Sequence, residues 1–164
     1  MPLSTPIAAV RCEVLNVSPK TNWTFACVEL ADGRSAWGEA SLNAWEPILR
    51  AAIAMLGENL RGVALSAASA ALPVSPWSPG GLVQATAISA VQQALLELMA
   101  DAQHQPWHAP LGPRQRNSVR AYANINRSVT DRTPQGFADA ARRAVAAGYR
   151  AVKLAPFDGV IAED

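Results

Sequence analysis

The segment from residue 118 to 154 constrains the fold most, because its pattern predicts a strand, a helix and a second strand in succession. Residues 118–125 and 149–154 are rich in residue types that favour strands. Between them, Thr133 and Pro134 suit the cap and the first position of a helix. The spacing of its apolar residues predicts an inner face that consists of Phe137, Ala141, Ala144 and Val145.

A strand–helix–strand unit of this kind needs further strands beside it, because parallel strands are apolar on both faces and have open edges. A (β/α)₈ barrel takes roughly 250 residues, whereas 47 residues run from position 118 to position 164. No more than about a quarter of a barrel fits into that length. Either the chain is a fragment, or its two strands add to a sheet that is formed elsewhere.

The first forty residues predict a three-stranded antiparallel meander. Residues 7–17 and 23–30 are rich in β-branched and aromatic residues, and a polar turn joins them. Asp32-Gly33 then leads into a third strand over residues 35–40.

At Glu46 the apolar pattern changes to the period of a helix. Gly57 is placed to end this first helix, and residues 63–72 and 82–103 predict two more. The predicted inner faces are Ile48, Ala52 and Met55 or Leu56 in the first helix, and Ile88, Val91, Leu95, Leu98 and Ala102 in the last.

Prolines at positions 106, 110 and 113 mark a linker between these helices and the strand that follows. We therefore predict two domains. Residues 1–112 form an α+β domain, in which the meander packs against its helices, and residues 113–164 form an incomplete (β/α)₈ TIM-barrel segment.

Charge and composition argue against several classes of partner. The chain has 14 basic and 13 acidic residues, a net charge of +1 and no long run of either sign, so neither nucleic acid nor a membrane surface is expected. No signal peptide precedes the first strand, and no stretch reaches the ~18 apolar residues of a membrane-spanning helix, which predicts a cytoplasmic protein. Cys12 and Cys27 are expected to be reduced core residues.

Several short motifs follow one another along the chain. They are Asp32-Gly33 with Ala36-Trp-Gly-Glu-Ala40, then Ala94-Leu-Leu-Glu-Leu98, then Gln105-Pro106 to Leu111-Gly112, and finally Gly148-Tyr-Arg-Ala-Val-Lys153. Their order and spacing resemble the enolase superfamily, and within it the branch of mandelate racemase and muconate lactonizing enzyme. No single motif is specific, but the resemblance extends from residue 7 to about residue 160.

The resemblance implies a capping domain over residues 1–112 and the start of a barrel over residues 113–164. It implies that a full-length parent is a Mg²⁺-dependent dehydratase or racemase, which removes a proton alpha to the carboxylate of a small acid sugar. In this family three carboxylates at the ends of the third, fourth and fifth barrel strands bind the metal. The sequence stops before those strands, so we expect no metal ligand, no cofactor and no activity for this chain alone. Whether it is itself an enzyme stays open.

Lys153 is the candidate catalytic residue by this resemblance. It matches the first lysine of the family's lysine-x-lysine motif, while Ala155 stands at the second position. The Lys153 ammonium could hold a substrate carboxylate, or act as a base if buried; a lysine that merely extends into solvent is the plainer interpretation. The resemblance also predicts substrate-binding residues in the two loops of the capping domain, with ordinary turn chemistry as the alternative: Lys20, Asn22, Trp23 and Trp45.

The opposing hypothesis is a non-catalytic interaction or oligomerisation module. In that case the meander and its helices fold by themselves and form a monomer or a defined homo-oligomer. The residues do not reveal the substrate, its stereochemistry or the general base.

Overall fold

A computed structural model describes residues 2–18, 21–73, 81–126 and 128–156. The chain divides into two units, Met1–Pro113 and Arg114–Asp164, and each is described by itself. Lys20, one of the predicted substrate-binding residues, lies outside the described residues.

The first unit contains an antiparallel sheet in the order β1-β2-β3. Its strands are β1 (Ile7–Ser18), β2 (Thr21–Leu30) and β3 (Ser35–Glu39). Gly33 adopts a φ of +86° in the turn between β2 and β3, a conformation that glycine reaches without steric cost. The predicted meander is confirmed.

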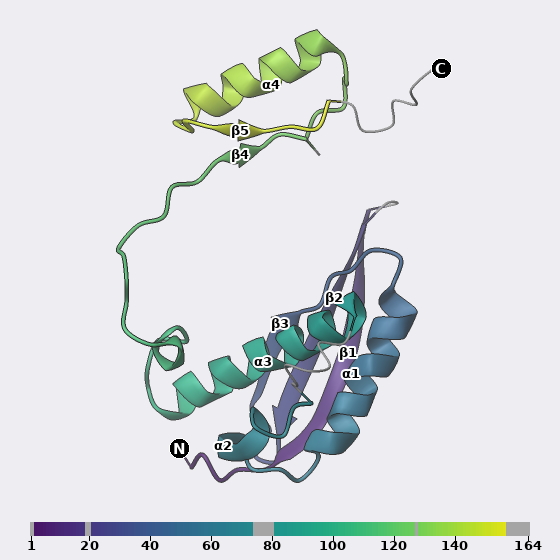
Figure 1. Ribbon diagram of the computed structural model, residues 1–164, viewed down its shortest axis with the longest axis vertical. Helices are drawn as coiled ribbons and strands as arrows, with labels where there is room; N and C mark the ends of the chain where they lie inside the picture. Colours follow the sequence, from purple (N-terminus) through teal and green to yellow (C-terminus); the bar gives the residue numbers. More distant parts are fainter. Residues whose placement is uncertain (1, 19–20, 74–80, 127, 157–164) are drawn as a thin grey trace. The chain divides into compact units, whose positions relative to one another are not determined.

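Helices α1 (Glu46–Leu60) and α3 (Leu82–Ala102) cover one face of this sheet (Figure 1). A short helix, α2 (Leu65–Ala68), packs against α3. A 3₁₀ turn, η1 (Ala109–Leu111), follows α3 along the chain. Two helices on one face of an antiparallel sheet enclose a single apolar core between the two layers. The largest fully buried side chains of that core are Ile7, Val28, Leu30, Leu49, Ile53, Leu60, Leu65, Val91 and Leu95.

The prediction for the inner face of α1 was wrong at Ile48 and Met55, whereas Leu56, the alternative to Met55, is buried, and Ala52 packs partly buried against the core. Leu49, Ile53, Leu56 and Leu60 are buried, whereas Ile48 and Met55 are 51% and 70% exposed. Both sets recur at helical spacing, so periodicity alone does not choose between them. Gly57 does not end the helix either; it lies against Val10 of β1, where an added Cβ would be 3.2 Å from the Val10 backbone oxygen and from its Cβ.

The prediction for α3 is confirmed, since its whole predicted stripe is buried. By length and composition α3 is also a candidate membrane span, which the sequence analysis did not expect. Its inner face nevertheless packs against β2, β3 and α1, as the central helix of a folded core does.

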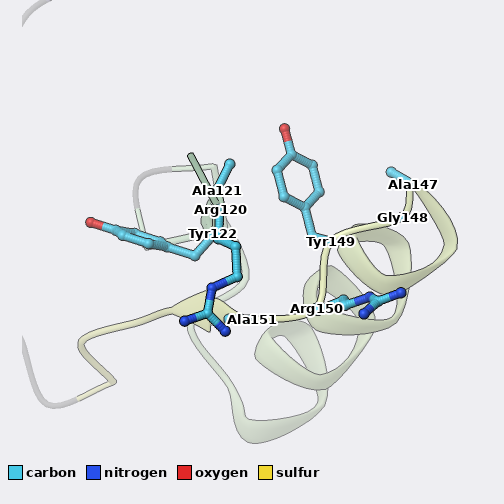
Figure 2. A pocket seen from close by; sticks show the side chains of 8 residues that line it. All are labelled: Arg120, Ala121, Tyr122, Ala147, Gly148, Tyr149, Arg150 and Ala151. Carbon is cyan, nitrogen blue, oxygen red and sulfur yellow. The ribbon is translucent and has the colours of Figure 1, made fainter. Parts of the chain in front are cut away.

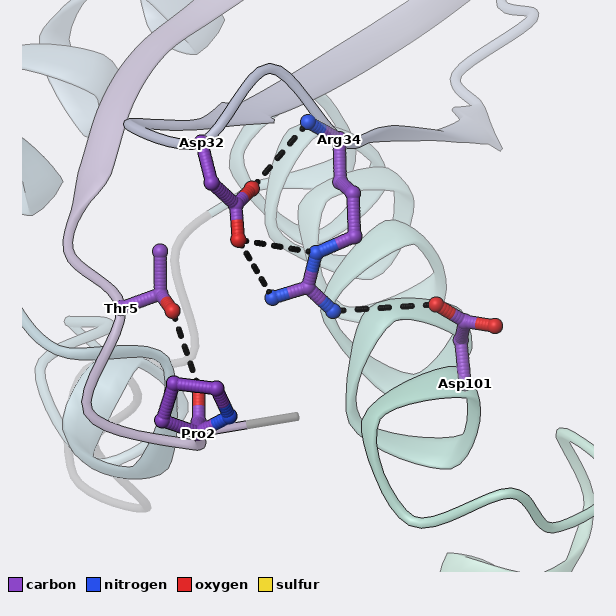
Figure 3. A network of polar contacts seen from close by, with 5 residues as sticks. All are labelled: Pro2, Thr5, Asp32, Arg34 and Asp101. Carbon is purple, nitrogen blue, oxygen red and sulfur yellow. Dashed lines mark hydrogen bonds and ion pairs between the residues drawn. The ribbon is translucent and has the colours of Figure 1, made fainter.

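Arg34 connects the β2–β3 turn to the end of α3 (Figure 3). Its Nε and Nη2 donate to Asp32 Oδ2 over 3.0 and 2.9 Å, and its Nη1 lies 3.7 Å from Asp101 Oδ2. The Arg34 hydrogen bonds lower the pKa of the Asp32 carboxyl below its usual value. One guanidinium thus joins two elements that are distant in sequence.

The second unit contains β4 (Ala123–Asn124), α4 (Pro134–Ala146) and β5 (Val152–Lys153). β4 and β5 pair in parallel, so the predicted strand, helix and strand are all present, but both strands are shorter than expected. Val119 and Tyr122, which were predicted to lie in the first strand, are 78% and 54% exposed. Two paired strands do not make a barrel, and the barrel segment stays a prediction.

Helix α4 packs on one face of this strand pair. Thr133 caps it, because its hydroxyl accepts a hydrogen bond from the Gly136 N–H over 3.1 Å. Gly148, with a φ of +94°, follows its end. The inner face differs in one residue, since Val145 is 65% exposed. The small core contains Ile125, Val129, Phe137, Ala140 and Ala144.

Candidate functional site

Lys153 lies beside Asn124 where the two parallel strands end. The Cα atoms of these residues are partners in the register of β4 and β5, and the Ile125 N–H donates to the Lys153 carbonyl over 3.0 Å. The preceding pair, Ala123 and Val152, packs against the core under α4. Because side chains alternate along a strand, Asn124 and Lys153 lie on the face that α4 leaves uncovered. Both are exposed.

Polar groups of neighbouring segments surround the chain just after Lys153. The side-chain oxygen of Asn126 accepts a hydrogen bond from the Ala155 N–H over 3.0 Å, and Arg132 donates to the Ala155 carbonyl over 2.8 Å. The Asn126 N–H in turn donates to Asn124 Oδ1 over 3.3 Å.

Sequence reasoning missed Asn124, Asn126 and Arg132. A signal did exist for the asparagines, because ligands bind at the carboxyl ends of parallel strands, where a polar side chain such as Asn can contact them. Nothing in the sequence indicated that Arg132 would reach Ala155, since that contact depends on how the chain turns into α4.

A second group of polar residues lies at the tip of the β1–β2 hairpin. The Asn22 side chain accepts a hydrogen bond from Asn16 over 2.8 Å and donates one to Glu46 over 3.0 Å. The Ala44 N–H donates to the same Glu46 oxygen over 3.3 Å. These contacts enclose a shallow hollow of about 240 Å³, which is lined by Asn16, Ser18, Thr21, Asn22, Asn43, Ala44 and Glu46.

Hydrogen bonds lower the pKa of the Glu46 carboxyl below its usual value. The largest contribution comes from the N–H of Glu46 itself, followed by the amide of Asn22, and Ala44 adds a further one. Ala44 has a φ of +66°, which is uncommon for a residue with a Cβ. The loop before α1 therefore holds a strained backbone next to a carboxylate that stays charged.

The predicted substrate-binding residues do not share one hollow. Asn22 lines the polar one. Trp45 instead lines an apolar hollow of about 480 Å³ beside Leu42 and Leu82. Trp23 lies on β2 opposite Leu15 of β1, and it is 45% exposed. Asn22, at the start of β2, bonds to Glu46, the residue after Trp45, but Asn22 and Trp45 line different hollows.

A larger hollow, of about 570 Å³, lies at the amino ends of β4 and β5 (Figure 2). Arg120, Tyr122, Tyr149 and Arg150 provide its large side chains. Parallel α/β units bind ligands at the carboxyl ends of their strands. We therefore assign the candidate site to the end that bears Lys153.

Two curated relatives match parts of the chain. D-gluconate dehydratase of Thermoproteus tenax is 42% identical over 73 residues, which are 44% of this chain and 14% of that protein. D-galactonate dehydratase of Variovorax paradoxus (strain S110) is 28% identical over 116 residues, 69% of this chain and 30% of that protein. No protein-family model matches the chain.

Solved structures match nearly all of it. An isomerase from Streptomyces coelicolor A3(2) has 29% identity and a TM-score of 0.69, and the match covers 92% of this chain and 44% of that one. A member of the enolase superfamily from Salmonella Typhimurium has 22% identity and a TM-score of 0.76, over 92% of this chain and 42% of that one. The resemblance to the enolase superfamily is confirmed. The chain spans less than half the length of these proteins.

A further match is a mandelate racemase/muconate lactonizing enzyme from Sulfitobacter sp., with 20% identity and a TM-score of 0.77 over 93% of this chain and 43% of that one. This match shows a shared fold.

The magnesium site implied by the enolase superfamily does not fit the described residues. Among them, no group of three or more His, Cys, Asp or Glu side chains could hold a metal ion. In the second unit, Asp131 accepts a hydrogen bond from the Thr133 N–H over 3.1 Å, and Asp139 pairs with Arg142. These acids serve the start and the surface of α4, so none of them offers the convergent oxygen ligands that Mg²⁺ requires.

Proposed function

We propose that this chain is the capping domain and the first part of the barrel of an acid-sugar dehydratase or racemase of the enolase superfamily. The observation that carries the proposal is the place of Lys153, at the carboxyl end of β5 and on the face that α4 leaves uncovered. The two dehydratase relatives support an acid sugar as substrate.

In this proposal Lys153 holds the substrate carboxylate by charge. Its exposure favours that role over the role of a buried base. Asn124 lies in register beside it, and the Asn124 oxygen already accepts the Asn126 N–H. The Asn124 amide can therefore contribute a hydrogen-bond donor next to the ammonium. Ala155 provides no second lysine, so a base, if not Lys153 itself, comes from another strand.

Asn22, Trp23, Trp45 and Lys20 would select the substrate from the capping domain. The polar hollow around Asn22 suits hydroxyl groups, and the apolar hollow beside Trp45 suits a hydrocarbon surface. We keep the division of the chain into residues 1–112 and 113–164, and a cytoplasmic location, as part of this proposal.

Magnesium belongs to the proposal only for a longer parent protein. One solved structure that matches this chain, from Burkholderia xenovorans strain LB400, was determined with magnesium and fumarate bound; it has 22% identity and a TM-score of 0.77, over 92% of this chain and 41% of that one. We propose that the ligands of such a metal lie beyond residues 1–164 and that these residues alone do not catalyse the reaction.

Two measurements test the proposal. The first follows solvent deuterium exchange into a panel of acid sugars with Mg²⁺ and this chain, and turnover would contradict the proposal that residues 1–164 alone do not catalyse the reaction. The second follows the NMR signals of the Asn124 side-chain amide and the Ile125 N–H, which lie beside Lys153 in the strand pair, during titration with sodium gluconate. We expect a saturable shift that the Lys153→Gln variant loses and that Arg150→Gln, at the opposite end of β5, retains. Equal shifts in both variants would remove Lys153 from the site.

One observation favours the alternative of an interaction or oligomerisation module. The sheet face away from α1 and α3 leaves Leu15, Trp23 and Trp37 exposed by 55%, 45% and 49%. A second copy could cover this apolar surface and form a homodimer. Size-exclusion chromatography with light scattering would show a dimer, and Trp37→Ser would convert it to monomer. A monomer at every concentration would contradict this alternative.

A further inference from the structure

We propose that Asn126 and Arg132 are positioning residues, which fix the direction of the chain immediately after Lys153 and so present its side chain to the substrate. The inference rests on the proposed role of Lys153. The inference concerns the hydrogen bonds that fix the backbone after Lys153, which Lys153 itself does not make.

The backbone ladder between β4 and β5 ends at Lys153, and side chains continue it. The Ala123 N–H donates to the Ala151 carbonyl over 3.0 Å, and the Ile125 N–H to the Lys153 carbonyl over 3.0 Å. In a parallel ladder the next bond would join the Ala155 N–H to the Ile125 carbonyl. Instead the Ser128 hydroxyl donates to the Ile125 carbonyl over 3.1 Å, and Asn126 Oδ1 accepts the Ala155 N–H over 3.0 Å.

Arg132 binds the second backbone group of Ala155, its carbonyl. Its Nη2 donates to the Ala155 carbonyl over 2.8 Å, and its Nη1 donates to the Asn126 carbonyl over 3.1 Å. Both backbone groups of Ala155 are therefore engaged by side chains. The planar guanidinium can make these two bonds at once, which a lysine ammonium could not do with the same geometry.

Arg132 is itself held in place by the core of the unit. Its guanidinium carbon lies 5.2 Å from the centre of the Phe137 ring, and Phe137 is a buried residue of α4. The contacts thus link the end of β5 to β4 and to the first turns of α4. Lys153 is the last residue of a two-residue strand, so the segment after it would otherwise be loose, and precise sites need such support.

The test uses the full chain labelled for NMR, without any ligand. We expect the Asn126→Ala variant to accelerate hydrogen exchange of the Ala155 N–H by about tenfold, the factor that corresponds to ~1.4 kcal/mol. It should also raise the mobility of the Lys153 Cε, measured by ¹³C relaxation. Asn126→Asp keeps the acceptor oxygen and should restore both values, while Arg132→Lys should raise the Lys153 mobility.

Matched controls are Asn117→Ala and Arg143→Lys, two exposed positions of the same unit, and neither should change these values. An Ala155 N–H that already exchanges freely in the unmodified chain would overturn the proposal. So would unchanged values in Asn126→Ala with the Ile125 and Phe137 signals intact. If that variant unfolds the unit, the two conservative variants decide: a Lys153 mobility that stays constant in Arg132→Lys contradicts the proposal. These measurements use no ligand. A failed gluconate titration would therefore contradict the proposed function without affecting the result for Asn126 and Arg132.

Discussion

The side-chain amide of Asn22 donates a 3.0 Å hydrogen bond to Glu46, and so ties the tip of the β1–β2 hairpin to the first turn of α1. The two loops that the resemblance assigns to substrate recognition are thus already joined in the absence of a ligand. Glu46 also accepts the Ala44 N–H, which fixes the strained residue before the helix.

This contact should depend on pH. The pKa of Glu46 is lowered in the folded chain, so its contribution to stability is present above the usual carboxyl range and is lost as the pH falls through the folded value. As the pH falls below the usual carboxyl range, we expect the NMR signals of the Asn22 amide and the Ala44 N–H to shift together. In Glu46→Gln the transition should vanish. A transition that persists in this variant would assign it to another carboxyl.

Replacement of Gly38 should destabilise the first unit. An alanine Cβ at this position would lie 1.8 Å from the Ala90 carbonyl oxygen, so β3 and α3 would have to move apart. We expect Gly38→Ala to lower the free energy of unfolding by about 2–3 kcal/mol. Gly81→Ala is the control, because no atom lies within 4 Å of its added Cβ. Similar urea midpoints for the two variants would show that the layers separate at little cost.

Loss of the Arg34 side chain should also destabilise this unit. Arg34→Ala removes the bonds to Asp32 and the ion pair with Asp101, and we expect a loss of about 1–2 kcal/mol in urea unfolding. Arg61→Ala is a suitable control, because Arg61, the residue after α1, pairs with Glu58 of that helix at an exposed position. An equal effect of both variants would mean that the link between the turn and α3 adds nothing.

The two cysteines should react slowly in the folded chain. Burial raises the pKa of the Cys12 and Cys27 thiols, and the thiolate is the reactive form. Labelling with a disulfide reagent at neutral pH should become at least tenfold faster in urea, a difference of about 1.4 kcal/mol or more in accessibility. Cys27 pairs with Arg11 in the sheet register and Cys12 with Ala26, so the two side chains lie on opposite faces. Rapid labelling of either thiol without urea would contradict this description.

How far the sequence predicted the structure differed between its elements. The stripe from Ile88 to Ala102 was predicted correctly, because the large apolar residues of that helix recur at helical spacing. In α1 two sets do, and the choice of Leu49 over Ile48 depends on how the helix lies on β1, which no local pattern encodes. The strand before Asn124 was predicted too long, because an apolar parallel strand extends only where it has a neighbour.

The position of Lys153 at the end of a strand was predicted, whereas the side chains that hold the chain after it were not. A lysine at a strand end could be recognised from the residues that precede it. The hydrogen bonds from Arg132 and Asn126 to Ala155 depend on a turn whose course only the folded chain shows.

The close approach of Gly38 to Ala90 also limits how this protein can be engineered. Glycine 38 is the centre of the Trp-Gly-Glu motif, and its only role visible in the structure is to let a helix carbonyl lie against a strand. Anyone who transplants the β1–β2 hairpin into another scaffold must therefore move β3 and α3 with it as one piece. A graft limited to β1 and β2 would lack β3 and α3, the strand and the helix that pack against β2 in this fold.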